Sequence, residues 1–443
     1  MHGIFGKKSD TGGNGRPNSR LCCYYADTEQ RLISLSIAIL MKHLLPWFVA
    51  VALLAGSLVS AQDGGKRGMR AADAGLPPDA HELKIGDAAP DFALRGVDGR
   101  SYTLADFKDA NLLMVIFTSN HCPYCHAMEG QLAKLLADSK GRGLAVVAIN
   151  PNHPDAIRID ELGYSKYSDS FEDMKLYAKE QGFTFPYLYD GEQQVAAKAY
   201  GCLATPHVFL FDRQRKLRYM GRFDDSRFPD PATVTSPDAR NAVEALLAGH
   251  AVPVEVTRPQ GCSTKWASNK AEVAQADEQW NGAPVPVETI DAAGVTALVR
   301  NDTTKLRLIN VWAIWCVPCV KEFPGLVSLS RRLGNRDFEL ITISVDDPKE
   351  QAKVQQFLEK QHVAIPNRVK RSLRSDGRKT NNYLFTGANT EALLKALDHA
   401  APGPVPFTVA IAPGGKIIYR HAGQLDLSEV QAKLIEELGS YYK

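Results

Sequence analysis

The chain contains two apolar runs that each lead directly into an amphipathic segment. The first run covers residues 111–117 and the second covers residues 308–315. Apolar residues at roughly helical spacing follow both runs: Met128, Leu132 and Leu135 after the first, and Val320, Phe323, Leu326 and Leu329 after the second. A short apolar run followed by helical periodicity predicts a buried strand that continues into a helix. The same unit of structure is therefore expected twice.

A Cys-x-x-Cys pair stands at each expected strand-to-helix junction: Cys122 with Cys125, and Cys316 with Cys319. A helix N-terminus offers free backbone N–H groups and the positive end of its dipole, which favour a thiolate on the first cysteine. The second cysteine lies one helical turn further on, where it can attack a mixed disulfide. This context indicates two thioredoxin-like redox sites, with Cys122 and Cys316 as nucleophiles and Cys125 and Cys319 as resolving thiols.

A structural zinc site shared by the two cysteine pairs is an alternative interpretation. Structural zinc pairs usually lie much closer in sequence, on knuckle turns rather than after buried strands. Redox chemistry is therefore favoured, and no metal is expected. The inserts between the cysteines differ, Pro-Tyr in the first pair and Val-Pro in the second. We expect the two reduction potentials to differ for this reason, although the motifs do not state the direction of electron flow.

The motif around the second pair reads Trp315-Cys-x-Pro-Cys-x-x-Glu322-x-Pro, and it is followed by Val405-Pro406 and by a Pro-Gly-Gly turn at 413–415. In these features the C-terminal third of the chain resembles the TlpA/ResA-like thiol-disulfide oxidoreductases. The resemblance implies a thioredoxin fold and reduction of disulfides outside the cytoplasm, for example during cytochrome c maturation. It also implies that Glu322 takes part in the chemistry of the dithiol.

The first pair belongs to a different set of motifs. They are Gly-Asp-Ala-Ala-Pro-Asp-Phe at 86–92, Asn-His-Cys-Pro-Tyr at 120–124, Thr205-Pro206, and Gly-Cys-x-x-Lys-Trp at 261–266. In these motifs the central part of the chain resembles redoxin proteins, which are thioredoxin-like relatives of the AhpC/TSA peroxidase superfamily. The second cysteine, Cys125, departs from the single-cysteine relatives in that group.

The redoxin resemblance raises thiol-dependent, peroxiredoxin-like peroxidase activity as the alternative function of the central domain. Peroxiredoxins place a proline seven residues before the peroxidatic cysteine and a threonine or serine three residues before it. Val115 and Ser119 occupy those positions relative to Cys122. Because the serine fits and the proline does not, thiol-disulfide exchange is the favoured activity.

The remaining apolar and turn patterns follow the same order in both halves, with further strands and helices and then a hairpin and a closing helix. The expected strands lie at 144–149, 206–211 and 217–221, and at 339–345, 407–412 and 416–420. The expected helices lie at 170–180, 194–200 and 238–247, and at 348–360, 391–397 and 427–438. The predicted fold class is α/β, with two tandem thioredoxin-like domains at 83–253 and 285–443. Pro, Gly and polar residues predict linkers at 62–82 and 254–284.

The N-terminal region predicts export from the cytoplasm. Residues 41–61 have a short basic start, an apolar run and a small-residue cleavage site, as a signal peptide does. Residues 1–40 then form a mis-assigned start or a disordered extension. If Met1 is the true start, the apolar residues before and after Met41 are long enough for a membrane anchor. Both alternatives predict a periplasmic or otherwise extracytoplasmic protein, secreted or membrane-tethered.

Two X-Pro pairs, Thr205-Pro206 and Val405-Pro406, each open an apolar strand downstream of a dithiol. We expect both peptide bonds to be cis, which turns the preceding backbone toward the dithiol, where it can pair with an incoming peptide. The alternative is an ordinary trans proline at the start of a strand. The two pairs are therefore candidate substrate-binding residues.

Three ionisable residues near the dithiols are candidates for assisting their chemistry. Asn310 stands where thioredoxins often have a buried aspartate, and an amide cannot supply that proton. Glu322 is expected to serve instead, and its alternative role is a solvated helix charge. His121 and His126 flank the central dithiol and could lower a thiolate pKa, although exposed loop histidines are commoner.

After the expected export signal, Cys202 and Cys262 are the two cysteines that remain outside the dithiols. In an exported protein two unpaired cysteines tend to form a disulfide. We therefore expect a structural bridge between them, with exchange of one of them with Cys125 as the alternative.

The totals exclude some classes of function. Lys and Arg number 52 and Asp and Glu number 50, so the net charge of +2 argues against a nucleic-acid binder. Eight cysteines in 443 residues are too few for a disulfide scaffold. No cofactor beyond the redox-active disulfides is implied. The expected partners are cysteine-containing client proteins and, for a reductase, a membrane electron donor. A chaperone that holds thiol clients is the non-enzymatic alternative.

Overall fold

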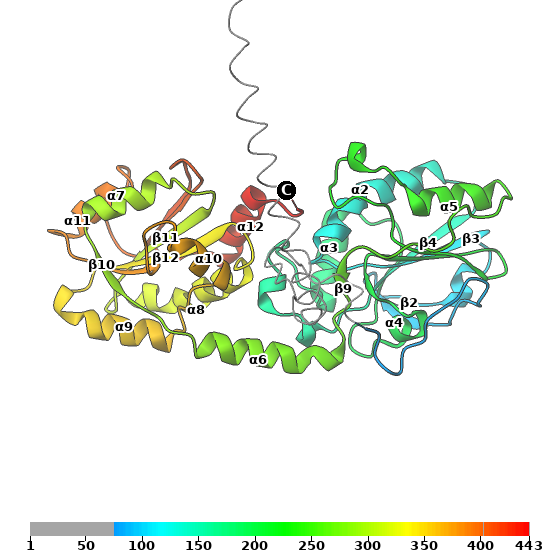
Figure 1. Ribbon diagram of the computed structural model, residues 1–443, viewed down its shortest axis with the longest axis horizontal. Coiled ribbons are helices and arrows are strands. Elements are labelled where there is room, and N and C mark those ends of the chain that lie inside the picture. Colours follow the sequence, from blue (N-terminus) through cyan, green and yellow to red (C-terminus); the bar gives the residue numbers. More distant parts are fainter. Residues whose placement is uncertain (1–74, 402, 443) are drawn as a thin grey trace, which may run out of the picture. The chain divides into compact units, whose positions relative to one another are not determined.

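The computed structural model describes residues 75–401 and 403–442, which fall within one compact unit of the chain (Figure 1). Two α/β domains follow one another in it, which confirms the predicted tandem thioredoxin-like fold. The segment 1–40, the expected export signal at 41–61 and the first part of the expected linker at 62–82 lie outside the described residues. Within the described ranges, no helix is both long and apolar enough to cross a membrane.

The first domain is built on a seven-stranded mixed sheet with the order β2-β1-β5-β4-β3-β7-β8. Its strands are β1 (Ala93–Gly96), β2 (Ser101–Thr103), β3 (Leu112–Phe117), β4 (Leu144–Asn150), β5 (Tyr187–Tyr189), β7 (His207–Phe211) and β8 (Leu217–Gly221). β3, β4 and β5 pair in parallel, and β7 pairs antiparallel with both β3 and β8. Its helices are α2 (Pro123–Asp138), α3 (Phe171–Gln181), α4 (Val195–Tyr200) and α5 (Asp238–Leu247).

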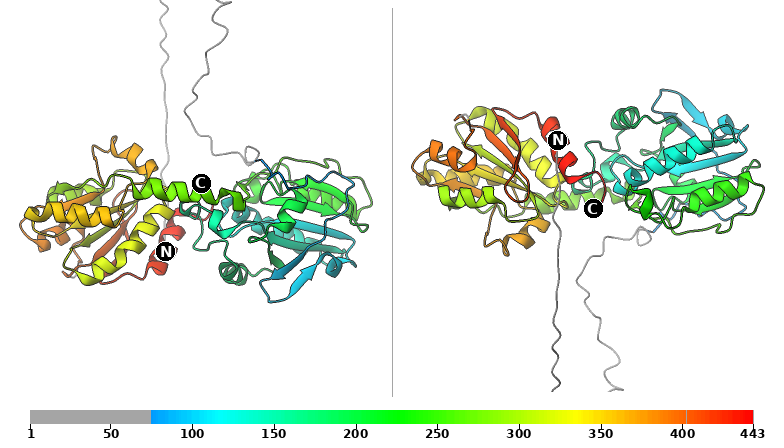
Figure 2. Two further views of the ribbon diagram at one scale, coloured as in Figure 1. Left: turned by 90° about the horizontal axis from the view of Figure 1, so that it is seen from below. Right: turned by 90° about the horizontal axis from the view of Figure 1, so that it is seen from above.

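The second domain has a six-stranded sheet with the order β10-β13-β12-β11-β14-β15. Its strands are β10 (Glu288–Ile290), β11 (Leu306–Trp312), β12 (Phe338–Ser344), β13 (Asn382–Phe385), β14 (Phe407–Ile411) and β15 (Ile417–Ala422). Its helices are α7 (Ala292–Arg300), α8 (Val317–Arg332), α9 (Gln351–Lys360), α10 (Asn367–Leu373), α11 (Thr390–Leu397) and α12 (Leu427–Leu438). Figure 2 shows, from two further sides, helices against both sheets.

The central strands β3 and β11 are mostly or wholly apolar because both of their faces are covered. In β3, Leu113, Val115 and Phe117 enter the core that contains α4 residues. The alternate residues Leu112, Met114 and Ile116 enter the core shared with α2, α3 and α5. β11 divides its side chains in the same way between two cores. Full burial of such a side chain stabilises the folded protein by roughly 1.5–3 kcal/mol. Because both faces of the strand are buried, its sequence lacks the alternation of apolar and polar residues that a half-exposed strand shows.

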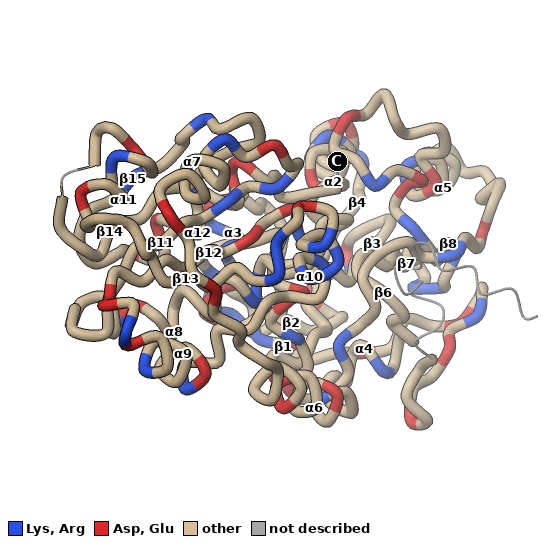
Figure 3. Tube along the Cα trace, turned by 60° about the vertical axis from the view of Figure 1, so that its left-hand side comes forward, with Lys and Arg blue, Asp and Glu red and all other residues tan. Residues whose placement is uncertain are grey.

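Charged groups are paired where they enter the second core. Arg307 on β11 and Arg378 both contact Glu339 on β12, with nitrogen-to-oxygen distances of 2.6 Å and 2.7 Å. All three side chains are largely buried, and the two guanidinium groups lower the pKa of Glu339 against the opposing effect of burial. In the tube drawing, acidic and basic residues are scattered along the chain, and basic residues gather near α10 (Figure 3).

The segment 254–284 is more than the linker that its composition predicts. It contains β9 (Cys262–Ser263), which pairs with β6 (Ala204–Thr205), and it contains α6 (Lys270–Asn281). Trp266 is buried in the core of the first domain, so that domain continues past residue 253. The linker prediction was wrong here because β9 has two residues, too few for a periodic pattern. α6 buries none of its residues and therefore lacks an apolar stripe.

The mostly polar segment 150–170, between β4 and α3, also carries local structure. It contains two short 3-10 turns, η2 (Pro154–Ala156) and η3 (Ile159–Glu161). Asp169, near its end, is fully buried. Four further 3-10 turns occur in the described ranges: η1 (Leu104–Phe107), η4 (Pro231–Thr233), η5 (Ala267–Asn269) and η6 (Pro348–Glu350).

Candidate active sites

The C-terminal cysteine pair lies where the sequence predicts it, between β11 and α8. Cys316 caps α8 and is joined to Cys319 by a disulfide, with a Cα–Cα distance of 5.3 Å. Both cysteines are buried, at 5% and 0% exposure, whereas Trp315 is 67% and Val317 64% exposed. The exposed apolar side chains stand on either side of Cys316 in the sequence. The disulfide is thus covered by protein on one side and bordered by an apolar surface on the other.

Glu322 lies on α8, three residues after Cys319, and is buried at 2% exposure. Its Oε1 accepts a hydrogen bond from Asn310 Nδ2 at 2.8 Å, and its Oε2 accepts one from Leu425 N at 3.1 Å. Burial raises the pKa of the Glu322 carboxyl, against the lowering effect of these hydrogen bonds. The alternative of a solvated helix charge is therefore wrong. A buried carboxyl with a raised pKa is suited to carry a proton.

The central pair has the same position between β3 and α2, and its cysteines are free thiols. Cys122 caps α2, and both Cys122 and Cys125 are 0% exposed. The Cys122 Sγ lies 3.0 Å from the carbonyl oxygen of Thr205, to which the thiol form donates. Ser119 Oγ lies 4.0 Å from Cys125 Sγ and 3.2 Å from Thr205 Oγ1. The backbone before Pro206 therefore lies directly against the first cysteine.

His121 and Asp169 form a buried pair beside Cys122. His121 Nδ1 lies 2.9 Å from Asp169 Oδ2, and the two side chains are 1% and 0% exposed. Asn152 and the backbone N–H of Asn120 donate further hydrogen bonds to Asp169. Burial opposes a charged imidazole, but the charge and hydrogen bond of Asp169 outweigh it and raise the pKa of His121. The pair thus favours the charged form of the imidazole next to the first cysteine.

The pKa values of the two central thiols, Cys122 and Cys125, are shifted in opposite directions. Burial on its own would raise the pKa of Cys122. Hydrogen bonds from Cys125 and Cys262, together with the charge of His121, instead hold that pKa well below its usual range. Burial and the neighbouring Cys122 thiolate raise the pKa of Cys125 well above its usual range. The arrangement favours a thiolate on Cys122 and a protonated thiol on Cys125, which is the division of roles predicted for a nucleophile and a resolving thiol.

Sequence reasoning named His121 without its partner and missed Asp169. The histidine is next to Cys122 in the chain, whereas the aspartate arrives from the far end of the loop at 150–170. The polar composition of that loop indicated solvent exposure, so no local signal distinguished Asp169 from its neighbours. The alternative of an exposed loop histidine is wrong for His121, which is 1% exposed.

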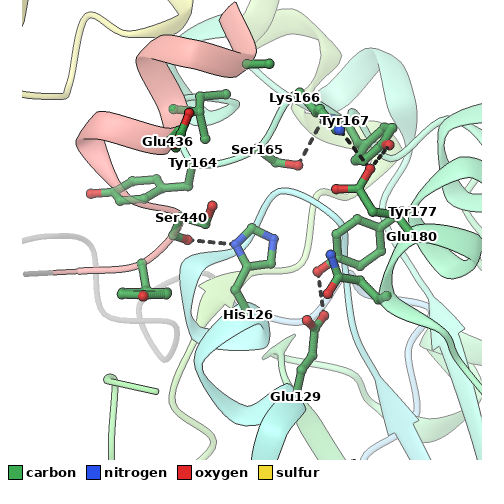
Figure 4. Close-up of a pocket in the computed structure, with 14 residues that line it drawn as sticks. His126, Glu129, Tyr164, Ser165, Lys166, Tyr167, Tyr177, Glu180, Glu436 and Ser440 are labelled. Atoms are coloured by element: carbon green, nitrogen blue, oxygen red, sulfur yellow. Dashed lines mark hydrogen bonds and ion pairs between the residues drawn. The ribbon is translucent and has the colours of Figure 1, made fainter. Parts of the chain in front are cut away.

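His126, on the other side of the dithiol, lies on α2 and faces a cavity of about 340 Å³ (Figure 4). Its Nε2 lies 2.8 Å from Asn120 O and its Nδ1 lies 2.7 Å from Ser440 O. Glu129, one turn further along α2, accepts a hydrogen bond from Tyr177 at 2.5 Å. Burial raises the pKa of Glu129 to about 7.

The expected bridge between Cys202 and Cys262 is wrong, because both are free cysteines. Cys202 Sγ lies 3.4 Å from both Ala204 O and Thr264 Oγ1. Cys262 lies instead near Cys122, and the two thiols influence each other's pKa. The pairing of β6 with β9 decides this, since it sets Cys262 opposite Thr205, whose carbonyl already faces Cys122.

The two expected cis prolines are confirmed, at Thr205-Pro206 and Val405-Pro406. Thr205 is fully buried. Val405 is half-buried and packs against the core that contains Cys316 and Cys319. Both residues thus adjoin a cysteine pair, and their part in binding substrate remains a proposal.

Comparison with known proteins agrees with this geometry. Residues 85–220 match the AhpC/TSA family, and residues 282–434 match the Redoxin family. The chain carries two redoxin/AhpC-TSA thioredoxin-like domains in tandem.

Individual relatives each correspond to part of the chain. Thiol-disulfide oxidoreductase ResA of Geobacillus thermodenitrificans is 27% identical over 136 residues, which cover 31% of this chain and 68% of the relative. Alkyl hydroperoxide reductase E of Mycobacterium bovis is 28% identical over 145 residues, which cover 31% of this chain and 84% of the relative. The names of these relatives are consistent with an oxidoreductase, as the two dithiols predict.

Solved structures also resemble one half of the chain. A hypothetical protein from Sinorhizobium meliloti 1021 is 41% identical to this chain, with a TM-score of 0.37. The match covers 43% of this chain and 98% of that protein.

Proposed function

We propose that the protein is an extracytoplasmic thiol-disulfide oxidoreductase that exchanges electrons with protein cysteines through both Cys-x-x-Cys pairs, and that it acts as a reductant. The observation that carries the proposal is the opposite acidity of Cys122 and Cys125 at a helix N-terminus. The likeness to ResA and the export signal predicted at 41–61 support a site of action outside the cytoplasm. A membrane electron donor would then return the oxidised protein to its dithiol form.

In the central domain, the Cys122 thiolate attacks one sulfur of a client disulfide, and the other client sulfur leaves as a thiolate. Cys125 loses its proton and attacks Cys122 Sγ in the resulting mixed disulfide. The Cys122–Cys125 bond forms, and the client departs with both of its sulfurs reduced. The client gains two electrons, and the protein loses the same two. Thr205, next to Pro206, offers backbone groups with which an extended client peptide can pair.

In the C-terminal domain, Cys316 and Cys319 take the same roles once their disulfide is reduced. Glu322 would take up the proton that Cys319 releases when it attacks the mixed disulfide, and return it in the reverse reaction. The exposed Trp315 and Val317 provide apolar surface for a client beside Cys316. Val405 and Pro406 would position the client backbone.

The reduction potential of each dithiol tests the proposal. The full chain would be measured in glutathione redox buffers as two variants, Cys316→Ser/Cys319→Ser and Cys122→Ser/Cys125→Ser, each of which retains one pair. Potentials near roughly −270 mV mark a reductant, and potentials near roughly −120 mV mark a disulfide donor. A pair that forms no reversible disulfide in either variant would overturn the proposal for that domain.

A second candidate function, hydroperoxide reduction, is favoured for the central domain by the charged His121 beside Cys122 and by the AhpC/TSA match at 85–220. The Cys122 thiolate would attack a hydroperoxide, release the alcohol and become a sulfenic acid. Cys125 would then form the disulfide and release water. Consumption of hydrogen peroxide by the reduced full chain, compared with Cys122→Ser, tests this activity. Equal rates would exclude it.

A further inference from the structure

A third cysteine lies at the central dithiol. The antiparallel pairing of β6 and β9 sets Cys262 opposite Thr205. The carbonyl oxygen of Thr205 lies 3.0 Å from Cys122 Sγ. Gly261 permits this close approach, because a Cβ at that position would lie 2.0 Å from the same oxygen. Cys262 is consequently close enough to Cys122 for each thiol to influence the pKa of the other.

The three cysteines differ in their access to solvent. Cys122 and Cys125 are 0% exposed, whereas Cys262 is partly exposed. Cys202 is not part of this cluster, because its Sγ contacts Ala204 O and Thr264 Oγ1 and is itself fully buried. Of these cysteines, Cys262 is therefore the one residue that keeps part of its surface accessible to solvent.

We propose that Cys262 is a second resolving cysteine, so that the central site alternates between a Cys122–Cys125 and a Cys122–Cys262 disulfide. The inference rests on the proposed function, since it adds a second route for the same nucleophile. Cys125 approaches Cys122 from α2, and Cys262 approaches it from β9. A mixed disulfide on Cys122 can thus be resolved from either element.

The exchange step balances without an additional oxidant. Cys262 loses its proton and attacks Cys122 Sγ in a mixed disulfide with a client or with glutathione. The bond between Cys122 and the client sulfur breaks, the Cys122–Cys262 bond forms, and the client thiolate takes up a proton. Cys125 can then attack Cys122 and release Cys262 as a thiol. Alternatively, an external thiol can attack Cys262, which is the more exposed residue of the new disulfide.

The electrostatics of the site permit Cys262 to act after Cys122 has reacted. While Cys122 is a thiolate, its hydrogen bond to Cys262, followed by burial and by its charge, raises the pKa of Cys262 well above the usual range. A mixed disulfide removes that charge from Cys122, and with it two of the four causes that raise this pKa; burial and the charge of Glu161 remain. Lys265, whose Nζ lies 3.4 Å from Ser263 Oγ, favours the Cys262 thiolate by its charge. Cys262 is thus held protonated before the first step and becomes more acidic after it.

The test uses the full chain with Cys125→Ser, reduced and then treated with glutathione disulfide. We expect the Cys122–glutathione adduct to convert to a Cys122–Cys262 disulfide, identified by peptide mapping under non-reducing conditions. In Cys125→Ser/Cys262→Ser the adduct should persist, with glutathione release slower by on the order of tenfold or more, because the intramolecular attack is lost. Cys125→Ser/Cys202→Ser is the matched control and should behave like Cys125→Ser alone.

Two further outcomes separate the inference from the proposed function. If Cys125→Ser retains the glutathione adduct while Cys262→Ser still forms a Cys122–Cys125 disulfide, the inference is overturned and the proposed function stands. If neither variant forms a disulfide to Cys122, both are overturned. A circular dichroism spectrum like that of the unchanged chain shows that each variant is folded.

Discussion

The two cysteine pairs occupy the same position in their domains and differ in what surrounds them. Each follows a buried central strand and caps a helix. The central pair has a buried histidine, an aspartate and a third cysteine around its first thiol. The C-terminal pair has a buried glutamate on the same helix and exposed apolar side chains beside it. The position between strand and helix is therefore common to both cysteine pairs. The surrounding residues determine the acidity of each thiol and the groups with which it can react.

The two domains differ in the ionisable groups that can assist the dithiol. In the central domain, the charge on His121 stabilises the Cys122 thiolate before any reaction begins. In the C-terminal domain, Glu322 lies on α8 with a raised pKa and no histidine lies adjacent to Cys316 in the sequence. We expect the central site to be controlled by the acidity of its first thiol and the C-terminal site by a proton carrier.

The largest expected effect comes from removing one nucleophile at a time. Cys122→Ser and Cys316→Ser should each reduce exchange at their own site by at least about a thousandfold, because the covalent step is lost. The remaining site should keep its reduction potential. Insulin disulfide reduction by each variant measures the effect. If both variants retain full activity on protein clients, the redox interpretation is wrong and a chaperone that holds thiol clients is favoured.

A smaller effect is expected from Glu322→Gln, which removes the proton carrier of the C-terminal site. The exchange rate at Cys316 and Cys319 should fall by about a hundredfold, as for the loss of a general acid or base. The rate in the unchanged chain should depend on pH as Glu322 titrates, and this dependence should disappear in the variant. An unchanged pH–rate profile would show that Glu322 is structural. Exchange at the central pair serves as the control.

Glu322→Gln also tests the cost of burying this carboxyl. The pKa of Glu322 is raised in the folded protein, so its contribution to stability is fully present below the unfolded pKa of glutamate. That contribution is lost as pH rises through the folded pKa. Thermal unfolding should therefore show the variant more stable than the unchanged chain at neutral pH, with the difference shrinking in acid.

A still smaller effect is expected from breaking the buried pair beside Cys122. His121→Gln or Asp169→Asn should raise the pKa of Cys122 and slow its alkylation at pH 6 by on the order of tenfold, because the positive charge is lost. The pH dependence of iodoacetamide labelling, read by mass spectrometry, measures this. His126→Gln is the matched control, since His126 bonds to Asn120 O and Ser440 O rather than to a cysteine. Equal midpoints in all variants would contradict the role of His121.

The smallest effect is expected from Cys202→Ala. Cys202 carries no disulfide and contacts only a carbonyl and a hydroxyl through its sulfur. Both reduction potentials should stay unchanged, and the free energy of unfolding should fall by about 1 kcal/mol for the small cavity and lost contacts. Peptide mapping of the oxidised chain should find Cys202 reduced. A Cys202–Cys262 disulfide in that map would contradict this prediction and would support the structural bridge that the sequence predicts.

The sequence by itself determined the strand–dithiol–helix unit and its repetition. Residues 111–117 and 308–315 are mostly apolar because each range contains a central strand covered on both faces, and helical stripes follow directly. The hairpins and closing helices could also be predicted, because each shows its pattern of buried and exposed residues within a short stretch of sequence. Each cysteine pair lies within four consecutive residues. Its position at the helix N-terminus could therefore be predicted without knowledge of any tertiary contact.

Only the tertiary structure decided the surroundings of those cysteines. Asp169 meets His121, and Cys262 meets Cys122 rather than Cys202, because a loop and a two-residue strand return to the dithiol from distant parts of the chain. The buried Glu322 accepts hydrogen bonds from Asn310 and from the backbone of Leu425, which are distant from it in the sequence. Such contacts depend on long-range packing and leave no period in the sequence. The thiol acidity that they create is for that reason a property of the fold.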